Sequence, residues 1–336
     1  MSDTHCEMMN EEIISQLEAM RRQESGAYAC RDYFSQQRSE STECDFGMMK
    51  PMRTRWQQQQ STPLCPASRR KMIEWCYQIV DQCGFDRESV VIAISYLDRF
   101  LMTQSGVPAL HNNKTFQLVT MTCLYIAIKL FEPEVIDPSI VSHISRGLYT
   151  EQDIVDMEMV ILSALQWRVQ PPTAIAFVRH FLALVDLEER TKSQIVDASR
   201  IQIEKAVSNY EFIGINPSMI AAASILNTVH FMDRKLLPVS CQYSLSLVLE
   251  RYGSNRNIYG GKMREVMVKL LSTIIDKQVP VEQQDTVCKV TVPTASKSAQ
   301  EDRAFSPWSP ISIEKGPSDF ISSVSDALHA GSQIWS

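Results

Sequence analysis

The sequence predicts an all-α protein with two tandem five-helix domains, an N-terminal helix and a disordered C-terminal tail. Apolar residues recur at helical spacing through most of the chain between residues 68 and 277. Only 11 of the 336 residues are glycine, which favours helix over sheet. Pro171 and Pro172 interrupt the helical pattern near the middle of the chain, and a second set of helices follows them.

Residues 1–65 are predicted to hold one amphipathic helix and a polar linker. Between Glu11 and Arg22, the apolar side chains of Ile14 and Leu17 fall on one helical face. The sequence after Arg31 is polar and contains a run of glutamines, which is typical of a linker.

The first domain is predicted over residues 66–168. Gly84 ends its first helix, and Asp86 is placed to cap the second. The third helix is apolar nearly all round, which predicts a central, buried helix. Thr150 and Asp153 form a capping-box pattern at the start of the fifth. The five helices are expected at about residues 68–83, 87–103, 114–130, 138–145 and 150–165.

The second domain is predicted over residues 169–280. Its third helix, rich in alanine and other small or apolar residues, corresponds to the central helix of the first domain about 100 residues earlier. The remaining residues, 281–336, are serine-rich and lack sustained periodicity, which predicts disorder. Within this tail Ser306 and Ser309 each precede a proline and are candidate sites of proline-directed phosphorylation. The helices are expected at 174–185, 191–207, 217–232, 240–250 and 258–277.

Composition and motifs exclude several classes of function. A net charge of −6 argues against a nucleic-acid partner, and the longest uncharged run is too short to span a bilayer. The nine cysteines include no C-x-x-C pair, which is typical of reduced thiols in the nucleus or cytoplasm. There is no Gly-rich phosphate loop, no catalytic-triad motif and no metal-ligand spacing. We therefore expect no enzymatic activity, no metal and no cofactor.

Two charged residues do not fit the helical pattern. Lys129 closes the uncharged third helix, and Glu158 lies about 40° from Ile154, inside the apolar stripe of the fifth helix. A carboxylate in such a place must be paired, hydrogen-bonded or directed at a partner. Two explanations stay open from the pattern alone. One is an intramolecular bridge or a lysine that reaches solvent, and the other is a charged spot on an apolar interaction surface.

Arg69 and Asp98 form a second candidate pair. Arg69 opens the first helix of the first domain, and Asp98 lies beside the apolar stripe of the second. A structural salt bridge between the two helices is the interpretation we favour.

Four sequence blocks in this order resemble the cyclin box: "SRRKMIEWCYQIV", "VVIAISYLDRFL", "FQLVTMTCLYIAIKLFE" and "DMEMVILSALQW". The resemblance spans about residues 68–167, and "INPSMIAAASIL" continues it into a second cyclin fold. It implies the regulatory subunit of a cyclin-dependent serine/threonine kinase, active in cell-cycle progression and present in nucleus and cytoplasm.

The resemblance also implies roles for individual residues. The family's lysine and glutamate that contact the kinase fall on Lys129 and Glu158, with Leu130, Phe131 and Ile161 as apolar contacts around them. The family's chiefly structural arginine–aspartate pair falls on Arg69 and Asp98. The implied partner is a cyclin-dependent kinase, together with its substrates and inhibitors.

A substrate-docking patch, found in many cyclins, is matched in part. Met72, Trp75 and Gln117 occupy its positions. Lys71 stands where the family has a branched apolar residue, and Gln78 stands where it has an acid. The loss of the acid weakens the expected attraction for basic substrate peptides.

Two other users of the cyclin fold are alternatives. A protein similar to transcription factor IIB would need a zinc ribbon and a basic face, and this sequence shows neither. A scaffold similar to the pocket proteins would have no kinase partner.

Overall fold

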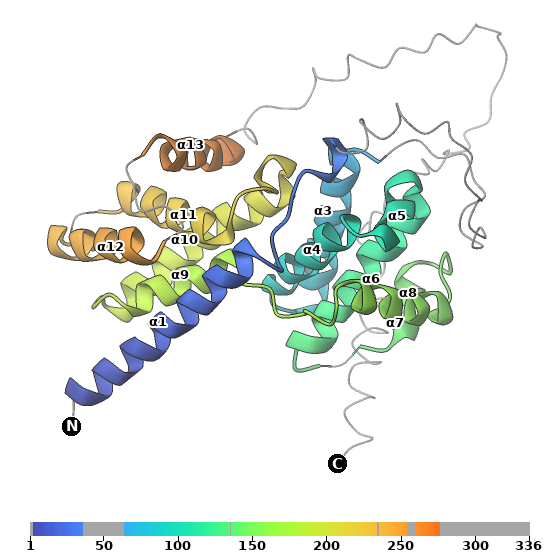
Figure 1. Ribbon diagram of the computed structural model, residues 1–336, viewed down its shortest axis with the longest axis horizontal. Helices are drawn as coiled ribbons and strands as arrows, with labels where there is room; N and C mark the ends of the chain where they lie inside the picture. The colour runs from blue at the N-terminus through green and yellow to red at the C-terminus, as the bar shows by residue number, and fades with distance from the viewer. Residues whose placement is uncertain (1–2, 36–63, 135, 234, 254–259, 276–336) are drawn as a thin grey trace, which may run out of the picture.

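The protein is described here by a computed structural model that covers residues 3–35, 64–134, 136–233, 235–253 and 260–275. Within these ranges the regular elements are helices and no strand occurs, which confirms the all-α prediction (Figure 1). The predicted tail, with Ser306 and Ser309, lies outside the described residues, as does most of the predicted linker.

The first helical domain is built around α6. Its helices are α3 (Pro66–Cys83), α4 (Glu88–Leu101), α5 (Val107–His111), α6 (Asn113–Phe131), α7 (Pro138–Ile144) and α8 (Glu151–Ala164). α6 packs against α4 and α8, and every residue from Leu118 to Ile128 is buried. By length and composition α6 is apolar enough to cross a membrane, but most of it is buried inside the fold as a core helix.

The short helix α5 was not expected from the sequence. Gly106 and Pro108 read as the end of a helix, yet a 3-10 turn, Gln104–Gly106, leads directly into α5. Pro108 occupies an early helical position, where its missing N–H removes no helical hydrogen bond. A Cβ at Gly106 would lie 2.1 Å from the Phe100 carbonyl oxygen, so this close turn requires glycine.

The second helical domain is built around α11. It comprises α9 (Ala174–Ala183), α10 (Glu189–Ser208), the 3-10 turn η2 (Tyr210–Phe212), α11 (Pro217–Phe231), α12 (Val239–Tyr252) and α13 (Gly261–Ile275). Polar groups buried at its centre satisfy one another: the Gln202 amide donates to Thr228 Oγ1 at 3.1 Å, and Asn227 Nδ2 donates to Gln202 Oε1 at 3.0 Å. Asn227 Nδ2 also donates to the Met267 carbonyl, which joins α11 to α13.

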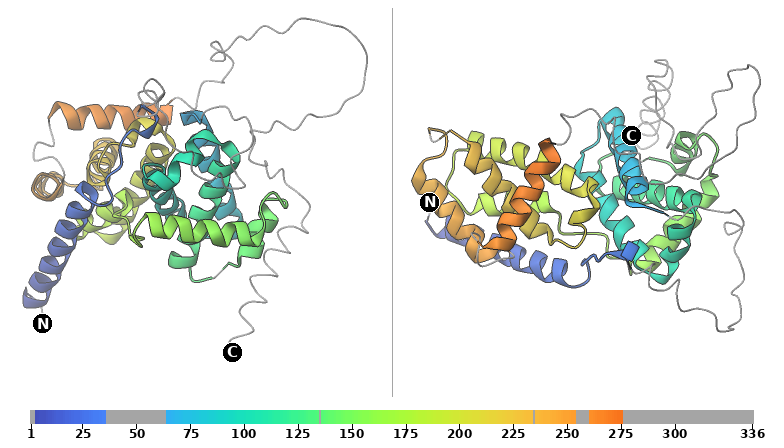
Figure 2. Two further views of the ribbon diagram at one scale, coloured as in Figure 1. Left: turned by 45° about the vertical axis from the view of Figure 1, so that its right-hand side comes forward. Right: turned by 90° about the horizontal axis from the view of Figure 1, so that it is seen from above.

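The N-terminal helix α1 (Asp3–Ser25) packs against the second domain, although the first domain follows it in sequence (Figures 1 and 2). It contacts α9 and α12, and Leu17 belongs to the core of the second domain. The buried carboxylate of Glu24 accepts from the Ser218 N–H at 2.9 Å and from its hydroxyl at 2.6 Å. A carboxylate in this position satisfies a donor in the first turn of α11, and its negative charge is stabilised by the positive end of the helix dipole.

Residues 28–35, which we call the strap, lead from α1 back to the first domain. The sequence assigns residues after Arg31 to a polar linker, but Tyr33 is buried and Phe34 packs against the core. The Tyr210 hydroxyl accepts from the N–H groups of Tyr33 and Phe34, at 3.0 and 3.2 Å. The strap is therefore tied to the second domain as well as to the first.

A buried ion pair lies where the strap, α3, α4 and α10 meet. Arg69 Nε donates to Asp98 Oδ1 at 2.8 Å, and Arg69 Nη2 donates to Asp98 Oδ2 at 2.6 Å. Arg69 Nη1 donates to the Val207 carbonyl on α10 at 2.8 Å, and the Tyr33 hydroxyl donates to Asp98 at 3.0 Å. Burial is the largest single effect and opposes the charge of Arg69, but the charge and hydrogen bonds of Asp98 together with Tyr33 and Cys30 outweigh it, so the pKa of Arg69 is raised.

Substituting Asp98→Ala should lower the free energy of unfolding by about 3–5 kcal/mol, because the Arg69 charge would remain buried without its counter-ion. Thermal or urea unfolding of the full chain measures this loss. Asp186→Ala removes an exposed carboxylate and should change stability by no more than about 0.5 kcal/mol. Equal losses in the two variants would contradict the structural role of the pair.

Candidate functional site

Helix α6 ends at the surface in a short segment of charged and apolar residues. The Asn112 side chain caps the helix by accepting from the N–H groups of Lys114 and Thr115. The helix ends at Phe131 because Glu132 has an extended backbone and Pro133 follows it. After the buried run, Lys129, Leu130 and Phe131 are the first exposed side chains. We call residues 129–132 the α6 end segment.

Helix α8 brings Glu158 beside this segment. Thr150 and Asp153 form the predicted capping box at the start of α8, with both reciprocal hydrogen bonds present. Glu158 then falls on the side of α8 that packs against α6. Lys129 Nζ lies 3.0 Å from Glu158 Oε1 and 3.4 Å from Oε2. The structure thus brings together the two charges that the helical pattern left unexplained.

The environment keeps Lys129 positively charged. Partial burial works against the charge, but the hydrogen bond to Glu158 and the neighbouring Tyr125 outweigh it and raise the pKa of Lys129. The ammonium lies 5.4 Å from the centre of the Tyr125 ring, within range of a cation–π contact. The Lys129 side chain is 41% exposed and that of Glu158 is 11% exposed, so the pair presents mainly its cationic side to solvent.

Exposed apolar side chains occur on the same two helices as this pair. A surface helix normally buries its apolar residues, so a group of exposed ones beside a charge pair is typical of an interaction surface. We call the pair and these neighbours the α6–α8 face. Its apolar members are Leu130, Phe131, Val155 and Met159.

The structure corrects one predicted contact on this face. Ile161 is 0% exposed and belongs to the core, so it is not available to a partner. The exposed residues Val155 and Met159 were missed. They are four positions apart and share one side of α8, a second apolar stripe that the sequence pattern could have revealed.

The predicted substrate-docking residues do not form an exposed apolar patch. Met72 and Trp75 are 5% and 6% exposed and belong to the core of the first domain. Gln117 is half-buried, and its Oε1 lies 3.4 Å from the Tyr149 hydroxyl. On the outer side of α3 the exposed side chains include Lys71 and Gln78, two of the positions where the sequence departs from the family. Met72 and Trp75 thus present little exposed area in the free chain, and docking through them stays a prediction.

The architecture defines a class: two consecutive helical domains, each built around one buried central helix, with a charged and apolar face at the end of the first central helix. The "Cyclin, N-terminal domain" family matches residues 32–170, and the "Cyclin, C-terminal domain" family matches residues 172–251. The chain belongs to the cyclin family.

Curated relatives come from several cyclin groups. This chain is 29% identical over 157 positions to G2/mitotic-specific cyclin-2 of Medicago sativa. That match covers 46% of this chain and 44% of the relative. The chain is 28% identical over 186 positions to cyclin-D3-1 of Arabidopsis thaliana, with 54% and 48% covered. It is 26% identical over 183 positions to G1/S-specific cyclin-E1 of Danio rerio, with 52% and 42% covered. Each match spans less than half of the relative's length.

Among solved structures, a viral cyclin from Herpesvirus saimiri is similar in fold. The TM-score is 0.52 at 21% sequence identity, and the match covers 63% of this chain and 88% of the viral chain. This likeness supports the tandem cyclin fold.

Replacing Lys129 by alanine should cost little stability. The pair is partly solvated at the lysine, and exposed or half-exposed pairs contribute about 0–1 kcal/mol. We expect Lys129→Ala to unfold within about 4 °C of the parent chain, measured by thermal unfolding. A loss as large as that of Asp98→Ala would show that the Lys129–Glu158 pair is mainly a structural element.

Proposed function

We propose that this chain is the regulatory subunit of a cyclin-dependent serine/threonine kinase, bound through the α6–α8 face. The Lys129–Glu158 pair carries this proposal, because it lies at the surface on two helices that also expose apolar side chains. A charge pair inside an apolar surface fixes the register of a partner, while the apolar residues provide much of the affinity. The cyclin-family membership of the chain supports a kinase as that partner.

In this proposal the cyclin performs no chemistry. The kinase supplies the lysine–glutamate pair and the magnesium-binding aspartate that phosphoryl transfer requires. Binding of the α6–α8 face beside the regulatory helix of the kinase shifts the kinase toward its competent arrangement. The associated roles are control of cell-cycle progression, contact with substrates and inhibitors of the kinase, and residence in the nucleus and cytoplasm.

Both matched families are cyclin domains, which favours this proposal over the alternatives similar to transcription factor IIB or to pocket proteins. Affinity purification followed by mass spectrometry of the bound kinase identifies the partner. Absence of any cyclin-dependent kinase from the purified complex would contradict the proposal.

Charge reversal separates a partner contact from an internal bridge. Lys129→Glu and Glu158→Lys, made singly, should each abolish kinase co-purification, because each places two like charges together on the face. The double variant restores an ion pair within the chain but exchanges the positions of the charges. We expect it to be as stable as the parent by thermal unfolding and still deficient in kinase binding.

Retention of the kinase by both single variants would overturn the role of these charges. Recovery of kinase binding in the double variant would show that the partner needs only the intact internal pair.

The chain also offers a matched aromatic control. Phe131 ends α6 and Phe231 ends α11, and their side chains are 43% and 71% exposed at corresponding places in the two domains. We expect Phe131→Ala to weaken kinase affinity at least about tenfold, measured by titration with the purified kinase, because buried aromatic anchors dominate interfaces. Phe231→Ala should leave affinity unchanged. Equal losses would place the interface on both domains.

A further inference from the structure

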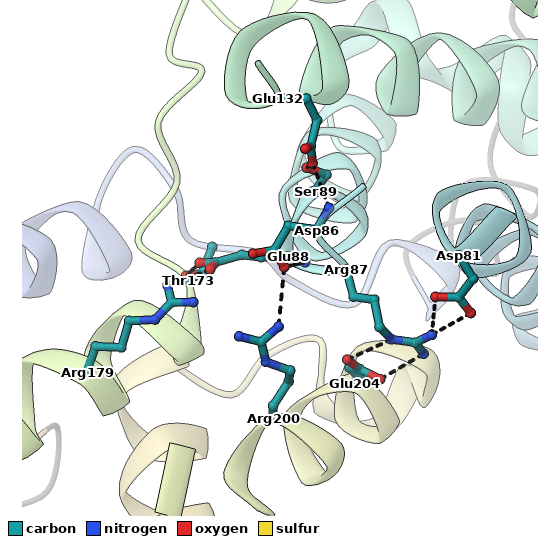
Figure 3. Close-up of polar contacts among 10 residues, drawn as sticks. All are labelled: Asp81, Asp86, Arg87, Glu88, Ser89, Glu132, Thr173, Arg179, Arg200 and Glu204. Atoms are coloured by element: carbon teal, nitrogen blue, oxygen red, sulfur yellow. Dashed lines mark hydrogen bonds and ion pairs between the residues drawn. The ribbon is translucent and has the colours of Figure 1, made fainter. Parts of the chain in front are cut away.

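The corner between α3 and α4, residues 86–89, is the centre of a polar network that reaches the second domain (Figure 3). Three consecutive residues make these contacts, and their partners lie on α9, at its cap or on α10. The contacts are Arg200 Nη1 to Asp86 Oδ1 at 3.3 Å, Arg87 Nη2 to Glu204 Oε2 at 2.9 Å, Thr173 Oγ1 to Glu88 Oε1 at 2.6 Å and Arg179 Nη1 to Glu88 Oε2 at 2.6 Å.

Glu132 ties the α6 end segment to the same corner. Its Oε1 accepts from the Asp86 N–H at 3.0 Å and from the Ser89 hydroxyl at 2.5 Å (Figure 3). Ser89 is buried and is the second residue of α4. The carboxylate thus lies at the N-terminal end of α4, where the helix dipole favours a negative charge.

The hydrogen bonds of Glu132 act beside the last turn of α6, where the helix is held by fewer hydrogen bonds than in its middle. The last turn of a helix lacks partners for its carbonyl groups and tends to fray. Leu130 and Phe131 lie in that last turn, and Glu132 follows them directly. The Glu132 carboxylate accepts two hydrogen bonds from the corner at residues 86–89. These bonds fix the end of α6, and with it the direction of the Leu130 and Phe131 side chains.

We propose that Glu132 is a positioning residue for the α6–α8 face, and that the corner 86–89 couples the α6 end segment to the second domain. The consequence for kinase binding rests on the proposed function. The coupling itself is a property of the free chain. Because coupling between two sites is reciprocal, disturbing either end of the network must loosen the other.

Hydrogen–deuterium exchange on the free, full chain tests the positioning. In Glu132→Ala, the amides of residues 130–132 should exchange at least about fivefold faster, because two charge-assisted hydrogen bonds are lost. Glu134→Ala, an exposed glutamate two residues further on, should change them by less than about twofold. Ser89→Ala removes one donor and should give an intermediate increase.

The isosteric variant Glu132→Gln keeps the shape and one acceptor oxygen, and it should restore most of the protection. It also keeps the test valid if the alanine variant unfolds. Unchanged exchange at residues 130–132 in both the Glu132→Ala and the Ser89→Ala variants would overturn the proposal.

A second comparison tests the coupling. Glu204→Ala breaks a contact on α10, away from the α6–α8 face, and should speed exchange at residues 130–132 at least about twofold. Glu132→Ala should in turn speed exchange around residues 200–204. Glu189→Ala, at the start of α10, is the control and should alter neither region. Effects of Glu204→Ala confined to α10 and the corner would refute the coupling.

The kinase experiment separates this proposal from the proposed function. If the parent chain binds no kinase, the function fails and the exchange data still decide whether Glu132 positions the α6 end segment. If the parent chain binds a kinase, Glu132→Ala should weaken the affinity at least about tenfold, and Glu132→Gln should recover most of it. Equal affinity of the parent and the alanine variant would overturn the positioning role in binding.

Discussion

The buried pair of Arg69 and Asp98 is the interaction on which the arrangement of this protein depends. A single guanidinium group uses three nitrogens to hold an aspartate on α4 and a carbonyl on α10, so one side chain from α3 spans both domains. The aspartate also accepts from Tyr33, which anchors the strap. Burying two charges is costly, and here the cost is offset because each charge meets several donors or acceptors. The ion pair therefore joins the two domains and the strap at one point.

Much of the fold could be predicted from periodicity. The long helices of the described ranges follow from apolar spacing, and the central place of α6 and α11 follows because a helix that is apolar all round has to be buried. The short α5 was missed because Gly106 and Pro108, read locally, end a helix. The strap was missed because Tyr33 and Phe34 stand next to each other at the start of a mostly polar stretch, and two adjacent aromatic residues show no helical or strand period.

The residues of the candidate site could be predicted from the sequence only in part. Lys129 and Glu158 could be selected because a charge on an apolar stripe needs a reason, and the structure has them 3.0 Å apart. Spacing reveals two apolar stripes on α8, one with Ile161 and one with Met159, but it does not assign one stripe to the core and the other to the surface. Met72 and Trp75 lie at helical spacing on one apolar stripe of α3, so their burial follows from local spacing, whereas their docking role was implied only by the family resemblance. The contacts from residues 86–88 to the second domain join pairs more than 80 positions apart, which no local pattern relates.

The bond between Glu24 and Ser218 has a consequence for the order of folding. The two residues are separated by 194 positions, so α1 leaves the ribosome long before the helix that its carboxylate caps exists. At about 5–20 residues per second, roughly 10–40 seconds of synthesis separate them. During that interval the first domain can close on its own core, because helices α3 to α8 are contiguous in sequence. The helices that α1 packs against, α9 and α12, are both made after the whole first domain, so the part of the chain that is made first packs only after that domain is complete.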